Sequence, residues 1–410
     1  MNILFLLPRY SEDVNDSTLE KDLVKEFYKQ GNKVTVVSIL EEKAKDYIKK
    51  LEGINVCKIK CGKYYSKGTT KIDKGLTLLK LPYIFSHKIP KLIKEEIDLI
   101  ILSTPMMNNP YLMKKLKKYY NCKILLIVWD IFPQNAVDVE MISNKILINY
   151  FTKKYKKALE KADYISAMSI GNQNYLIDKF KIKKDKVFIL KNWAVIKEKV
   201  KIDKKEIRSK YNFSEDEYIA IFGGNIGRLQ RLENILFLAE KCLENKKIKF
   251  LFIGSGSEKE RLEKLTKENN LSNVTFINQV PREDYEKVTA SCDIGLVSLD
   301  ERFTVPNFPS KTTDYFKLSL PILASLDRCA AKDYGNFLQN KVKSGLFAEA
   351  GNTEKLYNQF MKLYNDESLR KELGNNGRKY YEEYLGVDKA YETIMKEVER
   401  EWIYSKIKLY

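Results

Sequence analysis

The chain has 410 residues, 44% of them hydrophobic, which is enough for two domains with separate cores. A single histidine and six scattered cysteines exclude a zinc-type cluster built on these residues, so we expect reduced cysteines and no metal cofactor. No apolar run reaches transmembrane length and the first residues lack a signal-peptide pattern, so we expect a cytoplasmic protein.

Basic charge is concentrated in the N-terminal half. Residues 1–195 hold 36 Lys and Arg against 21 Asp and Glu, whereas residues 196–410 hold 37 against 34. A general lysine bias would spread evenly, so the N-terminal half is expected to face an anionic partner. Residues 71–94, 111–120 and 150–157 interleave lysine with leucine or tyrosine, a pattern that fits an anionic membrane surface and a solvated lysine face about equally well. If the partner is a membrane, residues 71–94 should make the main contact.

Strand-like apolar runs alternate with helical segments along the N-terminal half. A strand at Ile3–Leu7 is followed by a helix over residues 17–30, which Ser17 and Glu20 are expected to cap and Gly31 to end. Further strands are expected at residues 34–39, 99–102, 124–129, 164–168 and 187–190. Continuous apolar strands separated by helices predict a parallel sheet covered by helices on both faces.

The alternation restarts after a lysine-rich stretch at residues 197–210. Strands are expected at residues 219–222, 249–253, 274–277, 294–297 and 322–324. In the last segment a single helical face carries Tyr391, Ile394, Met395, Val398 and Trp402, and this face needs a partner.

The predicted fold is therefore α/β with two Rossmann-like domains. Residues 1–193 are expected to form an N-terminal domain, residues 194–387 a C-terminal domain, and residues 388–410 a C-terminal helix. A ligand is expected in an interdomain cleft, at the carboxyl ends of the strands.

Two segments have the pattern of phosphate-binding loops. The first, Phe222–Gly227, lies between a strand and a predicted helix, where glycines let the backbone approach a pyrophosphate and the helix N-terminus supplies free N–H groups. Arg228 and Arg231 are expected on the first turn of this helix, where they could add phosphate contacts. An ordinary tight turn would carry the same glycines, so this segment alone does not decide the function.

The second segment, Val305–Tyr315, also leads into a predicted helix. Ser310 and the amides that follow it can bind phosphate oxygens, and Lys311 adds a positive charge. Asp314, one helical turn later, can accept hydrogen bonds from ribose hydroxyls. A carboxylate at that place is more often a solvated surface residue, so this segment also needs support from others.

That support comes from blocks in the same order as in a known family. With the two loops, Phe252–Gly256, Val274–Phe276, Val280–Glu283 and Ala290–Val297 resemble the family 4 glycosyltransferases of the GT-B architecture. In the N-terminal half, Trp129–Asp138 is similar to a block of O-antigen and capsule biosynthesis enzymes, including the L-fucosamine transferase type. The resemblance implies a retaining hexosyl- or N-acetylhexosaminyl-type transferase in surface polysaccharide biosynthesis. Such an enzyme moves a sugar from a nucleotide-sugar to a saccharide or polyprenyl-linked saccharide, and we expect the donor to be a UDP-sugar.

The resemblance also implies that residues 1–193 bind the acceptor, that residues 194–387 bind the donor, and that the helix over residues 388–410 returns to the N-terminal domain. It further implies roles for single residues. Gly224 and Asn225 would lie against the pyrophosphate, Lys311 would neutralise it, and Asp314 would hold the ribose. The loops at Gly254–Gly256 and at Gln279–Val280 would frame the base, and Asp130 would face the acceptor. Together with the phosphate-loop argument, this makes the expected donor-binding residues Gly224, Asn225, Gly227, Arg228, Gly254, Gly256, Val280, Ser310, Lys311 and Asp314, and the expected catalytic residues Asp130, Lys311 and Arg231.

Two positions depart from the family pattern. Gln230 stands where many members carry a basic residue, and Arg228 or Arg231 would have to compensate. Pro306 stands where many members carry a glutamate that holds the sugar hydroxyls, which leaves Asp300 and Glu301 as candidates for that role.

Other functions are compatible with parts of the pattern. A GT-B nucleotide-sugar epimerase or an inverting transferase would share the donor loops. The sequence pI of about 9.2 could also indicate a nucleic-acid-binding protein, but the chain has no RRM, KH, zinc-finger or helix-turn-helix signature. We therefore expect a nucleotide-sugar donor, a saccharide acceptor and an anionic membrane surface as partners, no nucleic acid, and a position on the inner face of the cytoplasmic membrane.

Overall fold

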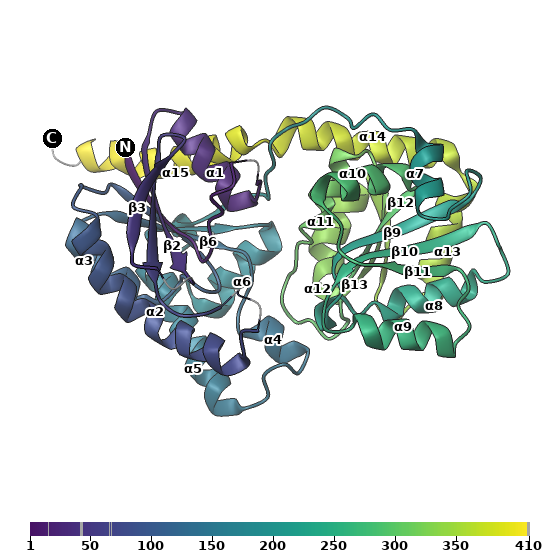
Figure 1. Ribbon diagram of the computed structural model, residues 1–410, viewed down its shortest axis with the longest axis horizontal. Helices are drawn as coiled ribbons and strands as arrows, with labels where there is room; N and C mark the ends of the chain where they lie inside the picture. The colour runs from purple at the N-terminus through teal and green to yellow at the C-terminus, as the bar shows by residue number, and fades with distance from the viewer. Residues whose placement is uncertain (15, 42–43, 65, 67, 408–410) are drawn as a thin grey trace. The chain divides into compact units, whose positions relative to one another are not determined.

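The computed structural model describes residues 1–407 apart from residues 15, 42, 43, 65 and 67, and it describes the side chains of these except at 71 and 401–407. The chain divides into two compact units (Figure 1). Unit 1 comprises residues 1–137 and 142–194 with the C-terminal segment from Val387, and unit 2 comprises residues 138–141 and 195–386. None of the described helices combines the length and the apolar composition needed to cross a membrane.

Unit 1 is built on an eight-stranded sheet in the order β3-β4-β2-β1-β5-β6-β7-β8. The strands are β1 (Asn2–Leu6), β2 (Lys33–Leu40), β3 (Tyr47–Leu51), β4 (Ile54–Lys60), β5 (Leu99–Ser103), β6 (Lys123–Val128), β7 (Tyr164–Ala167) and β8 (Val187–Ile189). All neighbours are parallel except β3, which pairs antiparallel with β4 at the edge. The strands β3 and β4 were not among those expected from the sequence.

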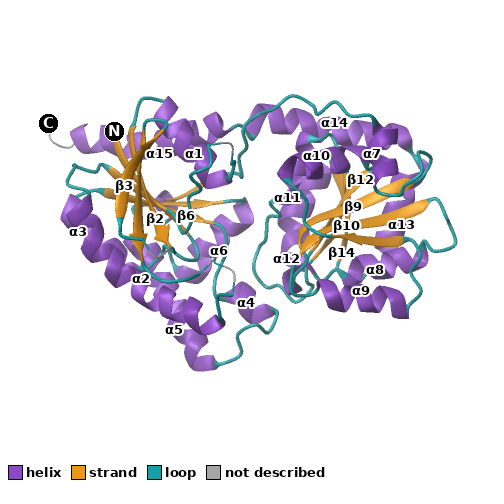
Figure 2. Ribbon diagram, viewed as in Figure 1, coloured by secondary structure: helices purple, strands orange, loops and turns teal. Residues whose placement is uncertain are grey.

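Helices cover both faces of this sheet (Figure 2). They are α1 (Leu19–Lys29), α2 (Lys71–Leu92), α3 (Pro110–Tyr120), α4 (Gln134–Asp138), α5 (Lys145–Lys161), α6 (Ile170–Phe180), the short η1 (Lys184–Lys186) and α15 (Val387–Ile407). The expected cap of the first helix was wrong by one residue. Thr18 accepts the Lys21 N–H at 3.2 Å, whereas the Ser17 hydroxyl donates to Asp22 at 2.8 Å.

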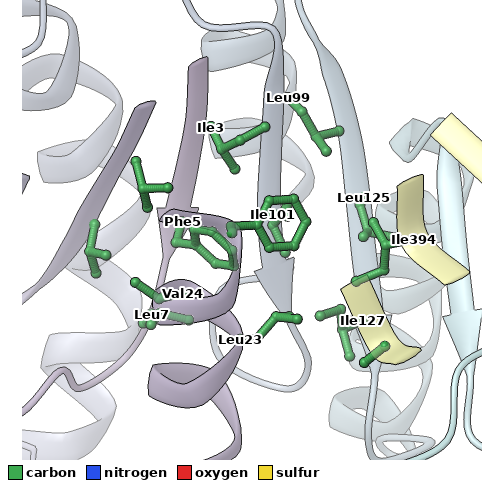
Figure 3. Close-up of a cluster of buried hydrophobic side chains, with 14 of the residues drawn as sticks. Ile3, Phe5, Leu7, Leu23, Val24, Leu99, Ile101, Leu125, Ile127 and Ile394 are labelled. Carbon is green, nitrogen blue, oxygen red and sulfur yellow. The ribbon is translucent and has the colours of Figure 1, made fainter. Parts of the chain in front are cut away.

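The C-terminal helix α15 packs on unit 1, as the sequence predicted. Its apolar face enters the core formed by β1, β5, β6 and α1, where Ile394 is fully buried (Figure 3). Tyr391 packs edge-on against Phe27 with ring centroids 4.8 Å apart, and the Tyr164 hydroxyl donates to the Val398 carbonyl at 3.3 Å. The predicted contribution of Trp402 lies outside the described side chains.

Unit 2 is built on a six-stranded parallel sheet in the order β11-β10-β9-β12-β13-β14. The strands are β9 (Tyr218–Asn225), β10 (Ile248–Ser255), β11 (Val274–Ile277), β12 (Ile294–Ser298), β13 (Ile322–Leu326) and β14 (Gly345–Glu349). The helical segments are α7 (Lys204–Lys210), η2 (Arg228–Gln230), α8 (Glu233–Lys241), α9 (Lys259–Glu268), α10 (Arg282–Ser291), α11 (Lys311–Lys317), α12 (Arg328–Ala330), η3 (Ala331–Gly335), η4 (Phe337–Lys341), α13 (Thr353–Asn365) and α14 (Glu367–Tyr384). This strand order is that of a doubly wound Rossmann-type sheet, which confirms the predicted fold class.

Candidate functional site

The strand order of unit 2 reverses between β9 and β12. At such a point the loops that leave the two strands run in opposite directions, and ligands of doubly wound proteins bind beside the carboxyl ends there. Gly224 and Asn225 end β9, and both are exposed. Asp300 and Glu301 follow β12. The residues predicted for the donor site therefore gather at the edge where this fold binds ligands.

The glycines of this edge allow two backbones to approach closely. Gly224 has a φ of +119°, and its register partner on β10 is Gly254, with a φ of +154°. A Cβ on Gly254 would lie 1.9 Å from the Gly224 carbonyl oxygen, and a Cβ on Gly256 would lie 2.2 Å from the Ile226 carbonyl oxygen. Larger residues would push the two loops apart, so these glycines are required by the geometry of the site.

A buried tyrosine fixes helix α11 to the same edge. The Tyr315 hydroxyl lies 3.1 Å from the carbonyls of Ile221 and Leu296, and it accepts the Gly223 N–H at 3.4 Å. This side chain ties the helix to β9 and β12, the two strands of the switch point. Lys311, the first residue of α11, is thereby held beside the glycine loop.

The amine of Lys311 lies in an unusual environment. Its Nζ is 3.8 Å from the centroid of the Phe222 ring, which offers a cation–π contact in place of water. Burial of the amine lowers the pKa of Lys311 to about 7, although the nearby Asp314 acts in the opposite direction. The charged form is thus disfavoured in the free protein, and an anion bound beside the amine would favour it.

Asp314, the predicted ribose ligand, is held by a partner that the sequence did not identify. Arg282 contacts both of its carboxylate oxygens, one of them at 3.2 Å. The same guanidinium donates to Glu286 at 3.0 Å, and Glu286 accepts from the largely buried Lys317 at 2.6 Å. Because Val280 stands two residues before Arg282, this network also brings the third predicted loop to Asp314. Arg282 lies inside one of the family-like blocks, which was the only signal for it in the sequence.

The two arginines after the glycine loop do not lie on the first turn of the α-helix that follows, so this expectation was wrong: Arg228 begins the 3-10 helix η2 and Arg231 follows its last residue. Strand β9 is followed by the 3-10 turn η2, and α8 begins only at Glu233. Arg231 has a left-handed backbone with a φ of +36°, and its guanidinium pairs with Glu301 at 2.7 Å. Arg228 lies 3.5 Å from Glu258. Gly and Asn tolerate such a backbone far better than arginine does, and strained residues of this kind cluster at functional sites.

The remaining predicted residues of this edge are Gly227 and Ser310. The Gly227 N–H donates to the Gln230 side chain at 3.2 Å, so Gln230 holds the loop where many family members carry a basic residue. Ser310 is exposed immediately before α11.

A cavity of about 330 Å³ opens beside this loop. Its charged lining comprises four arginines and four carboxylates, namely Arg228, Arg231, Arg261, Arg302, Glu140, Glu233, Glu258 and Asp300. Asp300 is buried and accepts from Arg302 at 2.7 and 2.9 Å. Burial alone would raise the pKa of Asp300, but these hydrogen bonds outweigh it and hold the pKa below its usual range. Among the described residues, Oε2 of Glu301 has no hydrogen-bond partner although the atom is buried.

Asp130 lies in unit 1, two residues after the end of β6. Its N–H donates to Thr104 Oγ1 at 3.3 Å, and its carbonyl accepts from the buried Tyr155 hydroxyl at 3.2 Å. The surrounding protein raises the pKa of the Asp130 carboxyl by desolvation, but the residue keeps an exposed surface. Its backbone is therefore fixed while its carboxylate stays accessible at the carboxyl edge of the unit 1 sheet.

Two doubly wound units, one with a phosphate-type loop at its switch point, define the GT-B fold. Residues 203–380 match the family described as "Glycosyl transferases group 1". The matched residues lie in unit 2, and the match supports a transferase.

Sequence relatives point the same way. The chain is 27% identical over 268 residues to WbjE of Pseudomonas aeruginosa, named a probable glycosyltransferase, which covers 63% of this chain and 64% of WbjE. It is 27% identical over 143 residues to WcaI of Escherichia coli K12, named for colanic acid biosynthesis, which covers 34% of each chain. The matched region is thus less than two thirds of either relative.

A solved structure matches over nearly the whole chain. The structure of HepE from Anabaena in complex with UDP-glucose has a TM-score of 0.67 and 13% sequence identity, and the match covers 98% of this chain and all of HepE. At this identity the likeness concerns the fold, and it extends the GT-B assignment to both units.

Proposed function

We propose that the protein is a retaining glycosyltransferase that moves a hexosyl or N-acetylhexosaminyl group from a UDP-sugar to a saccharide or polyprenyl-linked saccharide. The observation that carries this proposal is the meeting of three groups at one switch point, from two segments distant in the sequence, the end of β9 and the first turn of α11. These are the exposed backbone of Gly224 and Asn225, the amine of Lys311, and the carboxylate of Asp314. The backbone N–H groups can bind phosphate oxygens, the amine can neutralise the pyrophosphate, and the carboxylate can accept hydrogen bonds from the ribose hydroxyls. Together these groups match the parts of a nucleoside diphosphate.

Each part of the donor would have its own ligands. The amides of Gly224 and Asn225, with Ser310 and Lys311, would bind the pyrophosphate. Asp314 would accept from the ribose hydroxyls, sharing its oxygens with Arg282 as the free protein already arranges. The turn at Gly254 and Gly256 and the backbone at Val280 would frame the base.

Catalysis would depend on stabilising the leaving diphosphate. As the bond from the sugar to the diphosphate breaks, negative charge grows on the leaving oxygen, and Lys311 and Arg231 would stabilise it. Loss of one such charged donor should raise the barrier by about 2–4 kcal/mol. In front-face retention the leaving phosphate helps to remove the acceptor proton, and Asp130 would orient the acceptor or receive that proton.

Glu301 is our candidate for the group that holds the sugar hydroxyls. Asp300, the other sequence candidate, is already saturated by Arg302. Glu301 keeps one unpartnered oxygen, while Arg231 holds the other. It would replace the family glutamate whose place Pro306 occupies in this chain.

The relatives support the pathway and the donor in this proposal. WcaI is named for biosynthesis of colanic acid, and HepE was solved with UDP-glucose. We propose accordingly a role in surface polysaccharide synthesis, with the protein held peripherally on the inner face of the cytoplasmic membrane.

Nucleotide binding tests the donor site directly. Calorimetric titration with UDP, GDP and ADP should show the tightest binding for UDP, and Lys311→Ala and Asp314→Ala should each weaken it at least tenfold. Lys264→Ala, at an exposed lysine on α9, is the matched control and should bind like the wild type. Equal UDP affinity in all four proteins would contradict the assignment of the site.

Product analysis tests the reaction. With a UDP-sugar and an acceptor saccharide, NMR of the product should show the anomeric configuration of the donor. An inverted product would indicate an inverting transferase. An isomerised nucleotide-sugar formed without acceptor would indicate an epimerase.

A further inference from the structure

Helix α2 carries two apolar stripes, and only one of them is buried. The inner stripe, Leu81, Phe85 and Ile89, packs on unit 1 and is almost completely inaccessible to solvent. The outer stripe has the spacing of one helical face and consists of Ile72, Leu76, Leu79 and Tyr83, which are 74%, 46%, 63% and 59% exposed. A helix that is apolar on its outer face as well needs a second apolar partner.

The first turns of α5 add a second exposed apolar group. Ile146, Leu147 and Tyr150 are 80%, 48% and 52% exposed. Helix α3 lies between the two groups, because it packs on α5 and its Tyr111 ring lies 5.0 Å from that of Tyr83. The three helices lie on the same face of the unit 1 sheet (Figure 1).

Topology places both apolar groups at one edge of that sheet. Helices α2, α3 and α5 each lead into the next parallel strand, β5, β6 and β7, so they all run antiparallel to the strands. Their first turns therefore lie towards the carboxyl ends of the strands. This is the edge that carries Asp130.

The same three helices account for most of the net positive charge of the protein. Their sequences contain 15 lysines, five in α2, four in α3 and six in α5, against two acidic residues, Asp73 and Glu160. Their net charge of +13 compares with +15 for residues 1–195 and +18 for the whole chain. Exposed lysines at 80, 114, 118 and 153 are among them. A genome-wide preference for lysine does not explain a net charge concentrated in one helical layer.

We infer that the outer face of α2, with the first turns of α5, is the surface through which this protein docks on an anionic lipid bilayer. The apolar side chains enter the headgroup region and the surrounding lysines meet lipid phosphates, so the two attractions act together. A second copy of this chain would present the same dense positive charge, and like charges would oppose its approach. The inference specifies the surface for the peripheral attachment proposed above and rests on that attachment, but it does not depend on the transfer reaction.

Vesicle binding by full-length variants tests the surface. Wild-type protein should sediment with vesicles of phosphatidylglycerol and phosphatidylcholine and much less with phosphatidylcholine alone. Replacement of two side chains of the outer stripe, Ile72→Ser with Leu79→Ser, should weaken binding about tenfold or more. The matched control is Ile170→Ser with Phe237→Ser, which removes apolar side chains that are 59% and 44% exposed on other helices. The control should bind like the wild type.

A second readout does not depend on the strength of binding. In Leu79→Trp, anionic vesicles should shift the emission of the added tryptophan to the blue, and in Phe237→Trp they should not. Unchanged melting temperatures would show that the variants are folded, as expected for exposed positions.

The possible outcomes distinguish an error in the proposed docking surface from an error in the proposed membrane attachment. If wild type and the Ile72/Leu79 variant bind anionic vesicles equally, the surface is wrong although attachment stands. If wild type binds neither vesicle, or both equally, the attachment itself is wrong and the surface fails with it. A wild-type dimer that dissociates in the same variant, without vesicle binding, would overturn the inference in favour of a second copy as the partner. None of these readouts requires the transferase to be active.

Discussion

If Lys311 binds the pyrophosphate as proposed, its amine should make the affinity for a nucleoside diphosphate depend on pH. In the free protein its pKa is about 7, because burial disfavours the charged form. A bound pyrophosphate would place negative charge beside the amine and raise that pKa towards the ordinary value of about 10.4. Binding above pH 7 should therefore take up one proton, and the affinity should fall as the pH rises.

The size of the effect follows from linkage. Where the free amine is neutral and the bound amine is charged, each pH unit weakens binding by up to tenfold, or about 1.4 kcal/mol. Between about pH 7 and 9 the loss should reach about 50-fold, or about 2.3 kcal/mol, because half of the free amine is still charged at pH 7. The terminal phosphate of UDP, with a second pKa of about 6, is already ionised over this range and adds little of its own.

Calorimetric titration of UDP in two buffers of different ionisation enthalpy measures both the affinity and the number of protons taken up. Lys311→Arg is the matched variant, because a guanidinium stays charged throughout and should give a nearly flat profile. A wild-type profile as flat as that of the variant, with no proton uptake, would refute the placement of the pyrophosphate against Lys311.

Three further predictions test other parts of the site. Gly254→Ala should abolish UDP binding and lower the melting temperature, because the added Cβ would lie 1.9 Å from the Gly224 carbonyl oxygen. The control Gly75→Ala, at a glycine with open space around it, should do neither. Normal UDP binding by the Gly254 variant would contradict the close approach of the loops. Asp314→Asn should weaken the binding of UDP by roughly 1.5–3 kcal/mol but leave the binding of inorganic pyrophosphate unchanged, since the carboxylate is assigned to the ribose. Equal losses of affinity for both ligands in calorimetry would count against that role. Glu301→Gln should keep the UDP affinity and lower kcat/KM for sugar transfer about tenfold or more, and unchanged kinetics would remove Glu301 from the site.

Most strands could be predicted from local sequence because buried parallel strands are continuous apolar runs. The run Lys249–Ile253 and the exactly located Val274–Ile277 fall within β10 and β11 for this reason. Strand β3 escaped prediction because it pairs antiparallel at the sheet edge and its central residues are exposed. Because these residues are exposed, the strand Tyr47–Leu51 carries lysines where a buried strand would carry apolar residues.

The loops of the site could also be found in the sequence, but not the contacts among their side chains. The glycines at 224, 254 and 256 were recognised because only a few residue types let two backbones approach closely. Arg231 was expected on a helical turn, but its backbone is left-handed and it precedes α8. The sequence could not show this, because arginine gives no local signal for that conformation.

What the sequence by itself determined is the order of elements, the parallel sheets, the return of the C-terminal helix and the identity of the phosphate-type loops. The elements and sheets follow from periodicity, which acts over a few residues, whereas the return of the helix and the interpretation of the loops also needed the family resemblance. Only the tertiary structure decided that Arg282 holds Asp314, that Phe222 lies under the Lys311 amine, and that the outer stripe of α2 stays exposed. Each of these depends on which surfaces meet when distant segments pack. Strand order and helix docking determine that, and no spacing along the chain encodes it.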